Sequence, residues 1–280
     1  MTNLIDPVTA VTEADAEGPT ALLFANIRDT LNVNVVNLIW RHLATMPGAL
    51  EWVWSSLKPL YLGPAIASAN HIRDTLPLPT IEPLSREALA EAGLDGPALV
   101  SIRGILDSYY HTNALALVCF SAFLARFEGV ETHDPAMHPE NGAGTSPQST
   151  AVRAPLPRLI PISEMSPTVA GLIEELNGYG EDTDPALVAS MYRHLAHWPA
   201  YLDLLKMKLS PLHDTGELIA IVANTRRMGD ELGARLAYHI PTNERPPEIA
   251  PALLAVRRFA RHPIARMTGV CSLIRSITPQ

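Results

Sequence analysis

Length, composition and charge narrow the functions that this chain can have. The chain has 280 residues, 47% of them apolar and 18% charged, so it can bury the core of one large domain or of two ordinary ones. A formal net charge of −8 and an isoelectric point near 5.7 argue against nucleic acid or an acidic membrane surface as a partner. Two cysteines far apart in apolar runs, and an N-terminus without a signal-peptide pattern, predict a cytoplasmic protein without disulfide bonds.

The first half of the chain has the apolar spacing of a series of helices. Pro19 is well placed in a first helical turn, Asn34 is a candidate N-cap, and Pro47 ends one helix and begins the next. The longest apolar stretch, residues 114–125, is too short to span a bilayer, so we expect no membrane partner. Helices are predicted over 19–31, 34–44, 47–57, 63–75, 85–93 and 96–127.

A segment without periodicity follows, and then the helical pattern resumes. Residues 129–160 are rich in Pro, Gly and Ser, which is typical of a mobile linker that carries no catalytic group. No alternating runs of β-branched and aromatic residues indicate strands, so we predict an all-α protein. In the second half, helices are predicted over 166–176, 184–197, 199–209, 215–238 and 251–274.

The chain repeats one block of sequence in its two halves. Residues 40–61 and 192–213 align at a constant offset of 152 with nine of 22 positions identical, including the run Arg-His-Leu-Ala. About one or two identities are expected by chance, so the match indicates an internal duplication. A second match, between 97–103 and 251–257, occurs in the same order. We therefore predict two tandem repeats of about 130 residues, 1–128 and 161–280, packed as a pseudo-twofold pseudo-dimer.

The duplicated Arg-His pair is the first candidate for chemistry. If a pseudo-twofold axis passes between the two copies, His42 and His194 approach a shared pocket from opposite sides. A histidine near its ordinary pKa can act as a general base, and Arg41 or Arg193 can bind a carboxylate through two hydrogen bonds. The alternatives are histidines that pack in the core and arginines that form structural ion pairs.

Further candidate residues share helix faces with these pairs. Val35 and Leu38 lie on the predicted face of His42, and Met191 on that of His194. A polar and aromatic cluster, residues 109–113, interrupts the apolar character of the longest helix, and its Tyr110 and Asn113 could hold a water or a carboxylate, or form ordinary hydrogen bonds between helices. The sequence has no glycine-rich phosphate loop and no zinc motif, so we expect no cofactor and no metal.

These features together resemble the group I 2-haloacid dehalogenases, the DehI family. The resemblance rests on the duplicated helical unit, on Leu-Ala-x-x-Pro-Gly-x-Leu at 43–50, on Leu-Ala-x-Trp-Pro at 195–199, and on Tyr-x-x-Asn at 110–113. It implies an α-helical pseudo-dimer with its active site between the halves. It also implies that an activated water displaces halide directly, without an ester intermediate.

The resemblance carries over only in part to the residues of this chain. Asn113 stands at the position of the family's asparagine, which helps to hold the water. The position of the catalytic aspartate falls on Met191, and that of an aromatic pocket residue falls on Val35, so the chain resembles a divergent member. His194, one turn from Met191, could replace the base, which implies an imidazole-like pH profile and weak or absent halide release from 2-chloropropionate.

Three classes of function fit this reading. The first is a dehalogenase-like hydrolase of a small carboxylate substrate, with His194 or His42 activating water and Asn113 positioning it. The second is different chemistry on the same scaffold, such as an isomerase, a lyase or a site where the two histidines bind a metal. The third is a small-molecule-binding protein without catalysis. A homodimer is a candidate assembly.

Overall fold

A computed structural model describes residues 8–128, 156–181, 187–241 and 244–279. The described residues form helices and no strand, which confirms the all-α prediction. In the first half the helices are α1 (Gly18–Leu31), α2 (Leu38–Leu43), α3 (Ala49–Tyr61), α4 (Ala65–Thr75), α5 (Arg86–Glu91) and α6 (Gly96–Glu128). In the second half they are α7 (Pro167–Gly178), α8 (Ser190–Leu195), α9 (Pro199–Asp214), α10 (Glu217–Leu236), α11 (Ala250–Phe259) and α12 (Ala265–Ile277), with short helical turns at Ile162–Glu164, Ala237–His239 and Ala260–Ile264.

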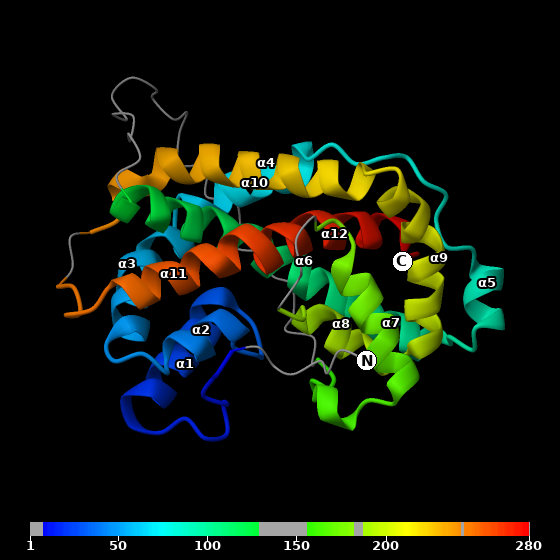
Figure 1. The fold of residues 1–280 in the computed structure, drawn as a ribbon, viewed down its shortest axis with the longest axis horizontal. Helices are drawn as coiled ribbons and strands as arrows, with labels where there is room; N and C mark the ends of the chain where they lie inside the picture. Colours follow the sequence, from blue (N-terminus) through cyan, green and yellow to red (C-terminus); the bar gives the residue numbers. More distant parts are fainter. Residues whose placement is uncertain (1–7, 129–155, 182–186, 242–243, 280) are drawn as a thin grey trace.

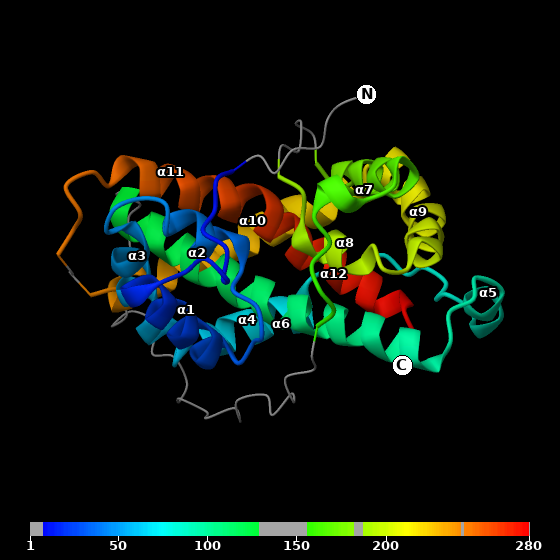
Figure 2. The same cartoon turned by 90° about the horizontal axis from the view of Figure 1, so that it is seen from below.

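The long helix α6 is the central element of the fold. Its 33 residues run through the molecule, with α10 and α12 of the second half alongside (Figures 1 and 2). From Thr112 to Ala125 every residue of α6 is buried, as expected of a helix surrounded by others. One continuous hydrophobic core therefore contains side chains from both halves of the chain. The pseudo-twofold relation between the halves stays a prediction.

Helix α10 can approach α6 closely because it presents glycine at the contact. A Cβ atom placed on Gly233 would lie 2.5 Å from the Cβ atom of Ser121 and 2.6 Å from the backbone nitrogen of Ala122. Such distances leave no room for any side chain. The two halves are therefore joined by direct helix-to-helix packing that depends on this glycine.

The duplicated block forms two short helices of the same length and register. α2 and α8 have six residues each, and their first residues, Leu38 and Ser190, differ by the offset of 152. The predicted starts of these helices were too early, since α2 begins four residues after Asn34 and α8 begins at Ser190 rather than near 184. Residues 33–37 are not helical, because the backbone N–H of Val36 donates to the Glu13 carboxylate at 2.8 Å instead.

Buried aromatic side chains fix the rotation of α2 and α8. Trp40 is 1% exposed, and its ring lies 5.2 Å from the rings of both Trp54 and Phe120, measured between centroids. The equivalent residue in α8, Tyr192, is completely buried. Truncating a buried residue of this size typically costs about 3–5 kcal/mol, so each helix is held in one orientation.

Parts of the chain before α1 and before α7, which are not helical, are packed against the helices in the described structure. The N-terminal segment lies against α2, because the backbone N–H of Val11 donates to the Arg41 carbonyl at 3.0 Å. Of the predicted linker 129–160, residues 129–155 lie outside the described residues, whereas the carbonyls of Arg158 and Ile160 bond side chains of the second half. Of the helices in the described ranges, none combines the length and apolar character needed to cross a bilayer.

Helices α11 and α12 are one predicted helix with a π-helical turn at Ala260–Ile264. Pro263 lies in this turn and has no N–H to donate, which disrupts regular α-helical bonding. π-turns often occur at functional sites. Here the turn places Pro263 and Ile264 in the wall of a cavity.

Candidate active site

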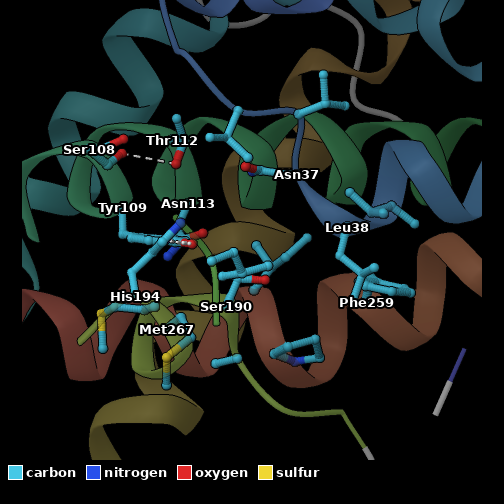
Figure 3. Close-up of a pocket in the computed structure, with 18 of the residues that line it drawn as sticks. Asn37, Leu38, Ser108, Tyr109, Thr112, Asn113, Ser190, His194, Phe259 and Met267 are labelled. Atoms are coloured by element: carbon cyan, nitrogen blue, oxygen red, sulfur yellow. Dashed lines mark hydrogen bonds between the residues drawn. The ribbon is translucent and has the colours of Figure 1, made fainter. Parts of the chain in front are cut away.

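A cavity lies where α2, α6, α8 and the π-turn meet (Figure 3). It offers about 70 Å3 to the centres of water-sized molecules, while one water needs roughly 10–15 Å3, so several waters or a small organic acid can fit. Both halves of the chain contribute, the first through residues 33, 35–39 and 41 and the second through residues 187–191 and 194. Its polar lining residues are Asn37, Arg41, Ser108, Tyr109, Thr112, Asn113, Ser190 and His194, and most of the others are apolar.

The cavity has a polar end and an apolar end. Tyr109 and Asn113 of α6 lie next to His194 of α8 at one end, and Leu38 and Phe259 lie at the other (Figure 3). Leu156 and Leu159, at the end of the predicted linker, also line the cavity. An elongated ligand with a polar head and an apolar tail matches this division.

At the polar end, two side-chain nitrogens are buried without a hydrogen-bond partner among the described residues. They are Nε2 of His194, a residue 1% exposed, and Nδ2 of Asn113, a residue 6% exposed. The other ring nitrogen of His194, Nδ1, lies 2.9 Å from the phenol oxygen of Tyr109. Buried polar groups almost always have partners, so these two nitrogens mark a place for a water or a ligand atom.

Burial and nearby cations keep His194 neutral. Burial is the largest cause that lowers the pKa of His194 from 6.5 to about 4, followed by the positive charges of Arg193, His197 and Arg41. The lowered pKa moves the imidazole-like pH profile that we expect from the sequence to lower pH. A neutral imidazole is the form that can accept a proton.

The two copies of the block present different residues to the cavity. Leu38 and Arg41 of α2 line it, at i and i+3, whereas α8 contributes Ser190, Met191 and His194. Among the predicted substrate-binding residues, Val35, Leu38, Arg41 and Met191 thus line the cavity. Arg193, the counterpart of Arg41, does not. It is 5% exposed, and its Nε donates to the Ile160 carbonyl at 3.1 Å.

The predicted pairing of His42 with His194 is wrong in this structure. His42 does not line the cavity, because its Nδ1 donates to the Thr9 carbonyl at 2.7 Å and its ring packs near Phe259. The N-terminal segment thus satisfies His42. The prediction that both imidazoles face one cavity with Asn113 holds only for His194.

Tyr110 also lies outside the cavity. Its ring contacts the guanidinium groups of Arg73 and Arg275, whose carbon atoms are 5.6 and 4.4 Å from the ring centroid. The neighbouring Tyr109 faces the cavity instead, and the sequence contained a signal for it. Tyr109 and Asn113 are four residues apart and share a helix face, while Tyr110 is turned about 100° away.

A buried polar network holds the cavity wall at residues 187–189. Asn177 of α7 donates to the Leu187 carbonyl at 3.2 Å and accepts a hydrogen bond from the Ala189 N–H at 3.0 Å. Arg266, 1% exposed, donates to Asn177 Oδ1 at 2.9 Å. These contacts fix the non-helical backbone that leads into α8, so Ser190 and His194 are presented from a rigid support.

Acidic residues and metal ligands are scarce at the site. No Asp or Glu is among the described residues that line the cavity, and Asp182 and Asp184 lie outside the described residues. Nor do three His, Cys, Asp or Glu side chains gather closely enough to hold a metal ion within the ranges that the structure describes.

Comparison with known proteins connects this fold and sequence to the haloacid dehalogenases. No protein-family model matches the chain. An (R)-2-haloacid dehalogenase from Pseudomonas putida is 32% identical over 97 residues, and the matched stretch spans 32% of this chain and 32% of that protein. A mutant D-2-haloacid dehalogenase in complex with D-2-CPA superposes with a TM-score of 0.70, covering 97% of this chain and 94% of that chain. A D-2-haloacid dehalogenase in complex with L-LA gives 0.68, covering 97% and 95%.

These similarities confirm the resemblance inferred from the sequence. Both solved structures are 17% identical to this chain, so they show that the chain has the fold of the D-2-haloacid dehalogenases. The curated relative matches over about a third of its length, and it adds sequence similarity to that likeness of fold.

Proposed function

We propose that this protein is a hydrolase similar to the 2-haloacid dehalogenases and acts on a small 2-substituted carboxylic acid in the cavity. One observation at the polar end carries the proposal. His194 Nε2 and Asn113 Nδ2 are buried there without a hydrogen-bond partner among the described residues, and the His194 imidazole is neutral. The similarity in fold and sequence to haloacid dehalogenases supports the same reaction class.

Arg41 is the residue that we assign to the substrate carboxylate. It is the cation that lines the cavity among the described residues, and its charge acts on both His194 and Tyr109. A guanidinium and a carboxylate form two parallel charge-assisted hydrogen bonds, which orient the substrate as well as bind it. The substrate's second carbon then lies toward the polar end.

His194 and Asn113 activate the water in this proposal. As the water oxygen attacks the second carbon, one water O–H bond breaks and its proton moves to His194 Nε2. The carbon–halogen bond breaks, and the halide leaves with the bonding electron pair, so configuration at carbon is inverted. The products are a 2-hydroxy acid, halide and a proton that His194 releases. The Asn113 amide donates to the water oxygen and holds it in line.

The electrostatics of the cavity suit this step. A base with a pKa near 4 has the basicity of a carboxylate, and an aspartate carboxylate is the base in the DehI family that this chain resembles. A substrate carboxylate bound to Arg41 cancels one of the charges that lower the pKa of His194, so the base becomes stronger when substrate is present. A bound substrate would displace water from the apolar part of the lining, which leaves fewer waters to compete with the bound nucleophile.

The apolar end predicts the size of the substrate. Leu38 and Phe259 at this end can contact a chain longer than the methyl group of 2-chloropropionate. Each buried methylene contributes about 0.8 kcal/mol, so the three additional methylenes of 2-chlorohexanoate can raise kcat/KM by up to about 50-fold. We therefore expect weak turnover of 2-chloropropionate and better turnover of 2-chlorohexanoate.

Halide release tests the proposal. Both enantiomers of each acid are incubated with the wild type and with His194→Ala, Asn113→Ala and, as a control, His71→Ala, which changes an exposed histidine on α4. Loss of a general base typically lowers the rate about 100- to 10,000-fold, so His194→Ala should be nearly inactive while His71→Ala matches the wild type. Robust turnover by His194→Ala would show that another group is the base. No release from any of the four acids would refute the dehalogenase reaction.

A further inference from the structure

The N-terminal strap, residues 9–13, bonds to the part of the cavity wall that the first half of the chain supplies. No strap residue is among the described residues that line the cavity. Three hydrogen bonds join the strap to the wall: His42 Nδ1 donates to the Thr9 carbonyl at 2.7 Å, the Val11 N–H to the Arg41 carbonyl at 3.0 Å, and the Val36 N–H to the Glu13 carboxylate at 2.8 Å. The strap therefore holds α2 and the residues just before it from outside the cavity.

Glu13 makes the bond of the strap that reaches furthest into the wall. Val36 lines the cavity and is 1% exposed, so its N–H needs an acceptor from the protein. Residues 33–37 are not helical, and Glu13 supplies the acceptor from 23 residues away in the sequence. The other oxygen of the same carboxylate pairs with the Arg28 guanidinium in the last turn of α1. One carboxylate thus ties the cavity wall to α1.

The position of Arg41 depends on these contacts because α2 is short. α2 begins two residues after Val36 and has six residues, whereas isolated helices need about 12–15 residues to be even marginally stable. Contacts with the rest of the protein therefore set its place. Without Glu13, the Val36 N–H would have to move toward water, and the start of α2 would move with it. A displacement of about 1 Å at a site can cost roughly 100-fold in function.

We propose that Glu13 is a positioning residue that sets the place of Arg41 for the substrate carboxylate. The proposal rests on the proposed function in assigning Arg41 to that carboxylate. The second half of the chain has a similar arrangement, because the Asn177 side chain accepts from the Ala189 N–H just before α8. Each half of the cavity wall is thus held by a side-chain oxygen that is distant in the sequence.

A double-mutant cycle tests whether Glu13 acts through Arg41. The probe is hexanoate, a carboxylic acid without a leaving group, and its Kd is measured by calorimetry. Residues that share a backbone segment typically couple by about 2- to 100-fold, so Glu13→Ala should raise the Kd about 10-fold. In Arg41→Gln protein, the same Glu13→Ala substitution should leave the Kd unchanged. Equal losses in both backgrounds would show a general structural effect and overturn the proposal.

Conservative variants and a control identify which contact of Glu13 matters. Glu13→Gln keeps an oxygen that can accept from the Val36 N–H, so its Kd should stay within about threefold of the wild type. A Kd for Glu13→Gln as weak as that for Glu13→Ala would overturn the role of the Val36 bond. Glu17→Ala removes an exposed carboxylate that makes no capping bond to α1 and should match the wild type.

Two further measurements keep the proposal separate from the folding of the variants and from the reaction. Circular dichroism checks the fold, and if Glu13→Ala does not fold, Glu13→Asp takes its place, because its shorter side chain cannot reach both partners. Coupled losses of hexanoate affinity without halide release from any haloacid would support the positioning role and count against the dehalogenase reaction alone. Halide release with additive effects of the two substitutions would overturn the positioning role alone. If the wild type does not bind hexanoate, both Arg41 as the carboxylate site and the positioning role are wrong.

Discussion

The buried neutral state of His194 has a consequence for stability that can be measured without a substrate. The pKa of this imidazole is lowered from 6.5 to about 4 in the folded protein, mainly by burial. As the pH falls below 6.5, the unfolded chain binds a proton at this histidine before the folded protein does. Protonation therefore stabilises the unfolded state, and the free energy of unfolding falls as the pH is lowered from 6.5 toward 4.

The size of this effect follows from the two pKa values. One pKa unit corresponds to about 1.36 kcal/mol, so the full difference is about 3 kcal/mol. Between pH 7 and pH 5 the unfolded state gains about 2 kcal/mol from this one group, because the folded imidazole is still mostly neutral at pH 5. Since stabilities of ordinary domains are about 5–15 kcal/mol, such a loss is readily measured.

Urea unfolding at pH 7 and pH 5 tests this reasoning on the wild type, His194→Gln and His71→Gln. His194→Gln removes the titrating group, so its stability should fall by about 2 kcal/mol less between the two pH values than that of the wild type. His71→Gln replaces an exposed histidine and should show the wild-type difference. Equal losses in the wild type and His194→Gln would refute the assignment of a buried neutral imidazole.

Four further outcomes are expected. The acid limb of kcat/KM on 2-chlorohexanoate should lie near pH 4, the pKa of His194 in the free protein, and a limb near 6.5 would contradict the lowered value. Arg41→Gln should raise KM about 10- to 100-fold through the lost carboxylate contact, and an unchanged KM in steady-state kinetics would remove Arg41 from substrate binding. Gly233→Ala should lower the free energy of unfolding by about 1–3 kcal/mol, because the added Cβ collides with α6. Gly171→Ala, at an exposed position of α7 where the added Cβ meets no atom, should raise the free energy of unfolding by up to about 1 kcal/mol, because alanine favours the helix more than glycine does. Asn177→Ala should cost about 2–4 kcal/mol in thermal or urea unfolding, since it leaves buried backbone groups without partners, and a neutral effect would show that the cavity wall does not depend on it.

Much of the helical structure can be predicted from the sequence because it depends on local chemistry. The side chain of Ser85 accepts from the Ala88 N–H at the start of α5, and Ser166 accepts from the Val169 N–H at the start of α7. Both caps act within three residues of the chain, and Pro19 in the first turn of α1 is an equally local signal. The duplicated block likewise indicated a corresponding helix in each half, and α2 and α8 match in length and register.

The fold class and the resemblance to haloacid dehalogenases also came from patterns along the chain. Apolar spacing distinguishes helices from strands without knowledge of any distant contact. The same patterns placed the second helix of each half too early, at 34 and 184. Its true start depends on contacts from elsewhere, such as the Glu13 carboxylate that holds the Val36 backbone outside the helix.

Only the tertiary structure decided which member of each Arg-His pair reaches the cavity. α2 and α8 have six residues each and are buried on several sides, so their sequence does not reveal which face meets the cavity. Partners distant in sequence make that choice. The Thr9 carbonyl, 33 residues away, accepts a hydrogen bond from His42. The Ile160 carbonyl, also 33 residues away, accepts one from Arg193.

The choice between Tyr109 and Tyr110 has the same origin. Both lie on α6, and their spacing from Asn113 favours Tyr109 only once the face of α6 that meets α8 is known. Arg73 and Arg275 hold Tyr110 on another side of the helix. The presence of a helix can be predicted from apolar residues that recur three and four positions apart. The direction in which each side chain points depends on which distant helices pack around it, because burial of the large apolar side chains sets the rotation of the whole helix.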